Sequence, residues 1–258
     1  LNFDGSVYRW VEQYLLGGTP VIAMTIHDRQ VYPGSMVEGT PYKFWEDDYA
    51  VVQYFVENFN ADPDRIIFTG NSGGCRRTSI INKTYPGLVD VFIANNGFID
   101  RPQGLTTATG EPLDYTDEDW KNVAASGIAI WSLTGQADRD YASSIQLGLE
   151  KIRGYYLEAG YSEEWFEDNF RYSLYPSNFF MYWGESDHSC TKVTYWYFFD
   201  KPYLGPYAEI IDGGQLVYYN PLEPGDTYSL PGVQNGIEGF EYPVYAESVL
   251  EWALSRTK

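Results

Sequence analysis

A serine enclosed by glycines follows a strand-like stretch of the chain. Residues 68–77 read FTGNSGGCRR, and within them Gly70, Ser72 and Gly74 match the pattern Gly-x-Ser-x-Gly. In a nucleophile elbow, a strained turn between a strand and a helix exposes the serine hydroxyl, and glycines stand where side chains would clash. The alternative is a glycine-rich turn in which Ser72 caps a helix. With 25 glycines in the chain the pattern alone is common, so the strand–turn–helix context carries the prediction.

A serine hydroxyl becomes a nucleophile when a nearby base takes its proton. The chain has 2 histidines: His27 lies upstream of Ser72, and His188 lies downstream, in WGESDHSC. In proteins whose serine lies in an elbow between a strand and a helix, the acid follows the serine in the chain and the histidine follows the acid. Only His188 lies after Ser72 and so satisfies this order. We therefore predict His188 as the base, the alternative being a hydrogen-bonded loop histidine. His27 is interpreted as a structural or cleft-lining residue.

The acid that orients the histidine should follow the strand between Ser72 and His188. The strand-like GIAIWSLTG is followed by QADRD, so Asp138 is the first candidate and Asp140 the competitor, which can instead cap the next helix. Asp187 adjoins His188 in the chain. Because adjacent side chains rarely face each other, Asp187 is interpreted as a solvated loop acid. The predicted set is Ser72, Asp138 and His188.

These three residue types together can cleave an ester through an acyl-enzyme. Asp138 would hold the tautomer of His188 and stabilise the imidazolium, and His188 would take the Ser72 proton. The backbone N–H of Gly73 would point at the developing oxyanion, and the dipole of the following helix would add to its stabilisation.

Elements that could position these residues alternate along the chain. Apolar periodicity predicts helices over residues 4–16, 45–59, 72–83, 142–159, 163–169 and 245–256, and strands over 19–26, 65–70, 89–97, 127–135 and 178–184. Buried strands that alternate with helices predict an α/β fold with a mostly parallel central sheet and helices on both faces. Turn clusters break the pattern over residues 192–243, which we interpret as an insertion or cap-like segment before the C-terminal helix of a single domain, 1–258.

Composition narrows the classes of partner. The formal net charge of −19 repels phosphate backbones, which argues against nucleic acid as a partner. The sequence has no apolar run long enough to span a membrane. With 24 Tyr, 8 Trp and 14 Phe, the chain has many rings that suit half-wet positions, where sugars and aryl groups can stack.

Three motifs together resemble a known group of proteins. They are ADPDRIIFTGNSGG at 61–74, LTGQAD at 133–138 and GESDH at 184–188. They resemble the branch of the α/β-hydrolase superfamily that holds feruloyl esterases, polyhydroxybutyrate-depolymerase-like esterases and prolyl-oligopeptidase-type serine hydrolases. The resemblance covers roughly residues 2–96, the two later loops and EWAL near the end. It implies a Ser72, Asp138, His188 triad without a metal or an organic cofactor.

The resemblance also implies features outside the triad. In that group a strand and a His-Gly-Gly-type loop supply a second oxyanion N–H. This chain begins with a stretch that resembles the part just after that loop, so we expect an N-terminally truncated chain. Some feruloyl esterases and tannases join their serine and histidine loops by a disulfide. Cys75 and Cys190 resemble that pair, the alternative being two buried thiols. A disulfide would favour a secreted or extracytoplasmic location.

Three functions stay open at this point. The first is a serine esterase that acts on a small-molecule or polysaccharide-linked ester. The second is a serine peptidase of the prolyl-oligopeptidase type, although such enzymes usually carry a propeller domain that this chain lacks. The third is a non-catalytic hydrolase relic that binds glycans through its aromatic rings.

Overall fold

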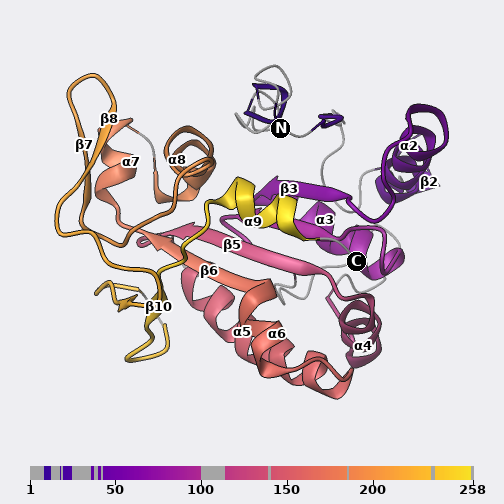
Figure 1. The fold of residues 1–258 in the computed structure, drawn as a ribbon. Coiled ribbons are helices and arrows are strands. Elements are labelled where there is room, and N and C mark those ends of the chain that lie inside the picture. The colour runs from indigo at the N-terminus through magenta and orange to yellow at the C-terminus, as the bar shows by residue number, and fades with distance from the viewer. Residues whose placement is uncertain are drawn as a thin grey trace.

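A parallel sheet of four strands lies at the centre of the protein (Figure 1). The computed structural model describes residues 9–12, 18, 20–24, 36–37, 40–41, 43–99, 114–138, 141–184, 186–233 and 236–256. The sheet has the order β3-β4-β5-β6. Its strands are β3 (Ile67–Asn71), β4 (Val91–Asn95), β5 (Ala129–Gly135) and β6 (Phe170–Tyr175).

The register of the strands brings their carboxyl ends to one edge of the sheet. Asn71, the last residue of β3, pairs with Asn95, the last of β4, and Asn95 pairs with Leu133 of β5. All residues of β4 and β5 are buried, as is typical of parallel strands that are covered on both faces. In such a sheet, ligands gather at the carboxyl ends of the strands, and Ser72 stands there, directly after β3.

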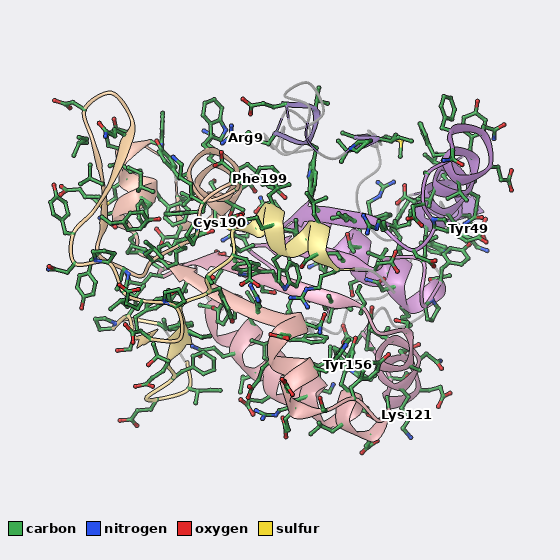
Figure 2. All side chains as sticks on the ribbon, in the orientation of Figure 1. Arg9, Tyr49, Lys121, Tyr156, Cys190 and Phe199 are labelled. Carbon is green, nitrogen blue, oxygen red and sulfur yellow. The ribbon has the colours of Figure 1, made fainter. Side chains whose placement is uncertain are left out.

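Helices cover both faces of this sheet. Figure 1 shows α9 on one face and α5 with α6 on the other. Tyr156 of α5 is fully buried and donates a hydrogen bond to the carbonyl of Ile128, which ties the helix to the start of β5 (Figure 2). The helices are α2 (Phe44–Phe59), α3 (Gly73–Thr84), α4 (Asp117–Ser126), α5 (Tyr141–Glu158), α6 (Glu163–Asn169), α7 (Asn178–Tyr182), η1 (Asp187–Ser189, 3-10), α8 (Cys190–Tyr197) and α9 (Val249–Ser255).

The predicted α/β fold with a parallel sheet is present, but two predicted strands are wrong. Residues 178–182, inside the predicted strand 178–184, form helix α7, and the strand lies earlier, in β6. Periodicity alone does not separate a short buried helix from a strand. The sequence of β6, FRYSLY, does not look like a buried strand because it contains a charged residue, Arg171. In the structure Arg171 is only 4% exposed, lies among aromatic rings and pairs with Glu247.

The second wrong strand is the one predicted over residues 19–26. In its described part, residues 20–24 form no strand. Half of the Ile22 surface (50%) and 40% of the Met24 surface are exposed. A strand that is buried on both faces needs a neighbouring strand, and in the described part of the chain β3 pairs with β4 alone.

Helix α4 was not predicted, although its start carries a clear signal. The Thr116 side chain accepts from the amide of Asp119, and the Asp119 side chain accepts from the amide of Thr116. This capping box fixes the first turn, and three acidic residues there complement the helix dipole. The polar composition of the helix hides its buried side chains, Trp120, Val123 and Ala124.

The segment predicted as an insertion, 192–243, packs against the open side of β6. It carries the end of α8 and four short strands. The hydroxyl of Tyr228 accepts from the amide of Leu174 and donates to its carbonyl, and the hydroxyl of Tyr245, just past the segment, accepts from the amide of Tyr172. These contacts satisfy an exposed strand edge, which otherwise pairs readily with other chains. The four strands are β7 (Ala208–Ile211), β8 (Gln215–Tyr218), β9 (Thr227–Tyr228) and β10 (Tyr242–Pro243).

The remaining strands are β1 (Met36–Val37) and β2 (Thr40–Pro41), which pair with each other. In the described part of the chain, no helix combines the length and the apolar character that a membrane span requires.

Candidate active site

Ser72 occupies a strained turn between β3 and α3. Its φ of 50° and ψ of −102° lie in a region that residues other than glycine rarely adopt. The turn is held by the Ser72 amide, which donates to the carbonyl of Asn95 over 3.0 Å. The Ser72 side chain makes no capping hydrogen bond to α3. Ser72 thus occupies the N-cap position of α3 but lacks the side-chain hydrogen bond that the alternative interpretation requires.

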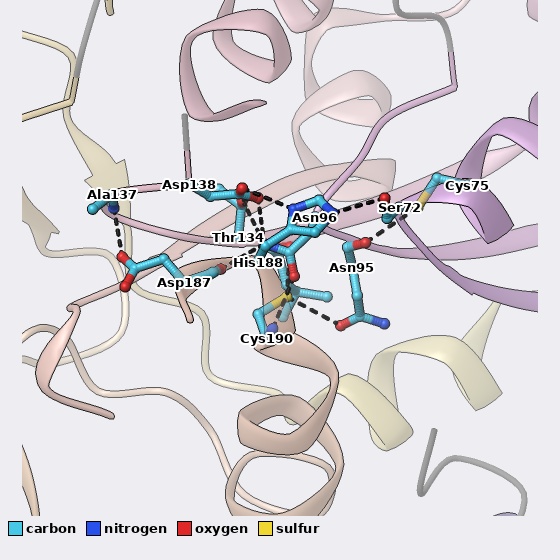
Figure 3. A network of polar contacts seen from close by, with 11 residues as sticks. Ser72, Cys75, Asn95, Asn96, Thr134, Ala137, Asp138, Asp187, His188 and Cys190 are labelled. Carbon is cyan, nitrogen blue, oxygen red and sulfur yellow. Dashed lines mark hydrogen bonds and ion pairs between the residues drawn. The ribbon is translucent and has the colours of Figure 1, made fainter. Parts of the chain in front are cut away.

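The Ser72 hydroxyl faces His188, and His188 faces Asp138 (Figure 3). Ser72 Oγ lies 2.7 Å from His188 Nε2, and His188 Nδ1 lies 2.8 Å from Asp138 Oδ1. The Asp138 side chain is buried, whereas about a third (35%) of the His188 side chain is exposed. The structure thus brings together all three residues of the predicted set. The competitor, Asp140, and the upstream histidine, His27, lie outside the described residues.

The two glycines of the Gly-x-Ser-x-Gly pattern differ in what surrounds them. A Cβ on Gly70 would lie 2.6 Å from the backbone carbon of Gly74 and 2.7 Å from the amide nitrogen of Cys75. Backbone atoms cannot move aside as a side chain can, so Gly70 is required where the strand meets the helix. A Cβ on Gly74 would meet no atom of the described residues within 4 Å. The expectation that both glycines prevent a clash holds for Gly70 alone.

The amide of Gly73 lies next to the candidate nucleophile. Gly73 is the first residue of α3, and the first N–H groups of a helix have no acceptor within it. A Cβ on Gly73 would also meet no described atom within 4 Å, so there is room beside this amide. The N-terminus of a helix favours negative charge. The position therefore suits the predicted oxyanion donor.

Asp187 links the turn that carries His188 to the loop that carries Asp138. Its Oδ2 accepts from the amide of Ala137 over 2.6 Å and from the hydroxyl of Ser177 over 2.7 Å. The interpretation of Asp187 as a solvated loop acid is thus wrong. The sequence could not reveal this role, because the donors lie 50 and 10 residues away in the chain.

Cys75 and Cys190 are buried free thiols, and the predicted disulfide is absent. Each sulfur is engaged separately. The Cys75 thiol lies 3.3 Å from the carbonyls of Gly70 and Asn95, and the Cys190 thiol lies 3.0 Å from the carbonyl of Leu133. Burial raises the pKa of both thiols well above the ordinary value, which keeps them protonated.

Asn96 joins the site, although no motif in the sequence marked it. It directly follows β4, has a φ of 52° and is fully buried. Its Nδ2 donates to Asp138 Oδ2 over 2.6 Å (Figure 3). The available signal was positional, because polar residues that follow a buried strand lie at the edge of a parallel sheet where sites form.

Segment 192–243 reaches the loop that carries Asp138. The Gln136 side chain donates to the carbonyl of Pro231, and Gln146 of α5 donates to the hydroxyl of Tyr242. Gln146 also accepts from the amide of Ile237 over 2.9 Å. The segment therefore lies beside the acid loop as well as along β6.

Comparisons with known proteins give structural likenesses among solved structures. No family model matches the chain, and no curated protein matches it. Among solved structures, a thermostable esterase is similar, with a TM-score of 0.41 and 18% sequence identity. The match covers 60% of this chain and 34% of that one, so this chain spans about a third of the esterase chain. A likeness of this degree carries no argument about this chain.

Proposed function

We propose that this protein is a serine hydrolase of the α/β-hydrolase type that cleaves carboxylic esters. Ser72 is the nucleophile, His188 the general base and Asp138 the acid that orients it. The observation that carries the proposal is the unbroken run of contacts, 2.7 Å from Ser72 Oγ to His188 Nε2 and 2.8 Å from His188 Nδ1 to Asp138 Oδ1. The left-handed backbone of Ser72 supports it, because strain of this kind gathers at functional sites.

The contacts suggest the order of the chemical steps. With the Nδ1–H of His188 donated to Asp138, the lone pair of Nε2 faces the Ser72 hydroxyl. Ser72 Oγ attacks the ester carbonyl while His188 takes its proton, and the Gly73 amide donates to the oxyanion. His188 then returns the proton to the departing alcohol. Water, activated by the same histidine, releases the acid and restores Ser72.

The substrate class is proposed to be an acyl ester linked to a carbohydrate. Exposed rings flank the turn that carries His188 along the chain: Tyr182 and Trp183 are each 42% exposed, and Trp196 is 65% exposed. Flat aromatic faces pack well against sugars and aryl groups, and the acidic chain disfavours anionic ligands.

The test of the proposal is hydrolysis of a short activated aryl ester. We expect Ser72→Ala to lower kcat/KM by about 10⁴-fold or more, since loss of a triad member leaves only oxyanion stabilisation and binding. Ser126→Ala is the matched control, because among the described residues the Ser126 hydroxyl contacts only the carbonyl of Val123, to which it donates within α4. Equal rates for the two variants would show that surface groups hydrolyse the ester and would refute the proposal.

A prolyl-oligopeptidase-type peptidase would use the same three residues. It is separated from an esterase by comparing a hydroxycinnamoyl ester of a sugar with a prolyl amide of similar size. The proposal predicts hydrolysis of the ester and none of the amide. Preference for the amide would assign the peptidase function instead.

A further inference from the structure

Asn96 makes a set of contacts that the proposed chemistry does not yet explain. Its Nδ2 donates to Asp138 Oδ2 over 2.6 Å, to the carbonyl of Asp187 over 2.8 Å and to Thr134 Oγ1 over 3.2 Å. Its Oδ1 accepts from the amide of Cys190 over 2.8 Å. An amide has two N–H groups, and the two shortest contacts account for both. The side chain is thus fully used.

These contacts join two parts of the site that are distant in sequence. Asp187 and Cys190 stand on either side of the turn that presents His188, and Asn96 binds the backbone of both. The same side chain binds the carboxylate of Asp138. The side chain of Asn96 therefore contacts both the acid and the turn that carries the histidine (Figure 3).

The position requires asparagine on three counts. Its φ of 52° favours asparagine among residues with a side chain. The buried Cys190 amide requires an acceptor, and the Asp138 carboxylate and the Asp187 carbonyl require donors. An aliphatic side chain would take this partner from the Cys190 amide and the Asp187 carbonyl, and would leave Asp138 Oδ2 with the longer contact to the Thr134 hydroxyl, 3.3 Å. An aspartate would place a second carboxylate beside Asp138.

Asn95 provides a matched comparison within the same strand end. Asn95 and Asn96 are adjacent, and both are fully buried. In the described part of the chain, Asn95 Nδ2 has no hydrogen-bond partner, and Oδ1 lies 3.6 Å from the Cys190 sulfur. The two residues share type, burial and place in the fold, and the side chain of Asn96 alone binds the acid.

We infer that Asn96 is a positioning residue of the proposed triad. It keeps the Nδ1–H of His188 directed at Asp138, because it binds the Asp138 carboxylate and the backbone on either side of His188. The inference rests on the proposed function. Asn96 touches no reacting atom and acts through Asp138 and the turn that carries His188. Without it, the carboxylate can rotate and the turn can shift, and misplacement of a catalytic group by about 1 Å can cost about 10²-fold in rate.

The first experiment compares Asn96→Ala with Asn95→Ala on a short aryl ester. We expect Asn96→Ala to lower kcat about 100-fold while KM changes less than about twofold. Asn95→Ala should stay within about threefold of the unsubstituted protein in kcat. Equal losses in the two variants would show a general packing effect and would overturn the inference.

The second readout is the tautomer of His188, measured by long-range ¹H–¹⁵N correlation in protein labelled at histidine nitrogen. The chain has 2 histidines, so His27→Gln assigns the signals. We expect the Nδ1–H tautomer of His188 in the unsubstituted protein and in Asn95→Ala, and a tautomer mixture in Asn96→Ala. An unchanged tautomer in Asn96→Ala would overturn the inference. This readout does not need activity, so an inactive protein with these spectra would refute the proposed function and leave the positioning role intact.

A third variant, Asn96→Asp, keeps the shape of the side chain and decides the question if Asn96→Ala does not fold. The titratable residues around this position are Asp138, whose carboxylate Asn96 contacts, His188, which contacts Asp138, and Asp187 and Cys190, whose backbones Asn96 contacts. Beside a second carboxylate the neutral form is favoured, and only that form can donate to Asp138. We expect kcat of the variant relative to the unsubstituted protein to rise about tenfold from pH 8 to pH 5. A ratio independent of pH would overturn the inference.

Discussion

The two halves of the candidate active site are built in different ways. The turn that carries Ser72 is shaped mainly by its neighbours in the chain, since Gly70 allows the backbones of β3 and α3 to meet. The half that carries Asp138 and His188 is held by side chains far away in sequence. Asn96 is 42 residues from Asp138 and 94 from Cys190, and it binds both.

This difference has a physical basis. A strained turn needs specific residue types at fixed spacing, because only some residues tolerate its backbone angles and its close contacts. A hydrogen bond between loops needs only a donor and an acceptor that the fold brings together. We call the part that carries Ser72 the elbow (residues 70–75). We call the part that carries Asp138 and His188 the acid–histidine region (residues 136–138 and 186–190). They should respond differently to substitution.

The largest effect is expected for Asp138→Asn, which replaces the acid that contacts His188 at the centre of the acid–histidine region. Both oxygens of Asp138 accept hydrogen bonds, Oδ1 from His188 and Oδ2 from Asn96. An asparagine must turn its N–H₂ toward one of these donors, so the histidine loses its orienting acceptor or the buried amide of Asn96 loses its partner. We expect kcat on an aryl ester to fall about 10⁴-fold with folding retained. A loss below tenfold in a folded variant would show that another group orients His188.

The next largest effect is expected in the elbow, and it is measured as a change in the free energy of unfolding. Gly70→Ala forces a Cβ to 2.6 Å from a backbone carbon, which requires β3 and α3 to separate. We expect the free energy of unfolding in urea to fall by about 3 kcal/mol. Gly74→Ala is the control, since its Cβ meets no described atom within 4 Å, and it should raise stability by up to about 1 kcal/mol. Equal effects of the two alanines would contradict the account of the elbow.

A smaller effect is expected for Asp187→Ala, at the rim of the acid–histidine region. The substitution removes the acceptor for the Ala137 amide and the Ser177 hydroxyl. Because the site is only partly buried, water can replace one of these contacts, and we expect about a tenfold loss in kcat. Ser177→Ala removes one contact and should cost less than Asp187→Ala. The reverse order of these losses would show that Asp187 does not link the two loops.

The smallest effect is expected for the two buried thiols, Cys75 next to the elbow turn and Cys190 at the end of the acid–histidine region. Burial raises the pKa of Cys75 and Cys190, so both are protonated in the folded protein at pH values where free thiols ionise. Stability from this source is present below the ordinary value of 9.0 and is lost as the pH rises above it. Iodoacetamide at pH 8 should label neither thiol in the folded protein and both in urea, and a reducing agent should not change activity. Rapid labelling of the native protein would contradict the observed burial.

The elbow could be predicted from the sequence, and the acid–histidine region only in part. The strand–turn–helix context pointed to Ser72 because glycine spacing reports local backbone geometry. Asp138 and His188 followed from chain order, and the structure places both in contact. Asp187 was misinterpreted and Asn96 was missed, since their partners come from other strands and loops. The disulfide that the resemblance implied between Cys75 and Cys190 is absent, and the fold gives each sulfur its own carbonyl acceptor.

The fold shows the same division. The parallel strands β3, β4 and β5 and most helices were predicted, because apolar periodicity is a local signal. The strand β6 was missed because its polar residue Arg171 is buried among rings from other elements, including Trp131 and Trp252. Only tertiary contacts explain how such a residue belongs to the core.

The most direct test of the account is the mass of the intact protein after reaction with a fluorophosphonate. In this reaction Ser72 Oγ bonds to phosphorus, fluoride leaves and His188 takes the proton. We predict a single adduct, mapped by peptide analysis to Ser72, which is absent in Ser72→Ala and forms much more slowly in His188→Gln. An adduct that persists in Ser72→Ala, or a folded protein without an adduct, would contradict the claim that Ser72 is an activated nucleophile.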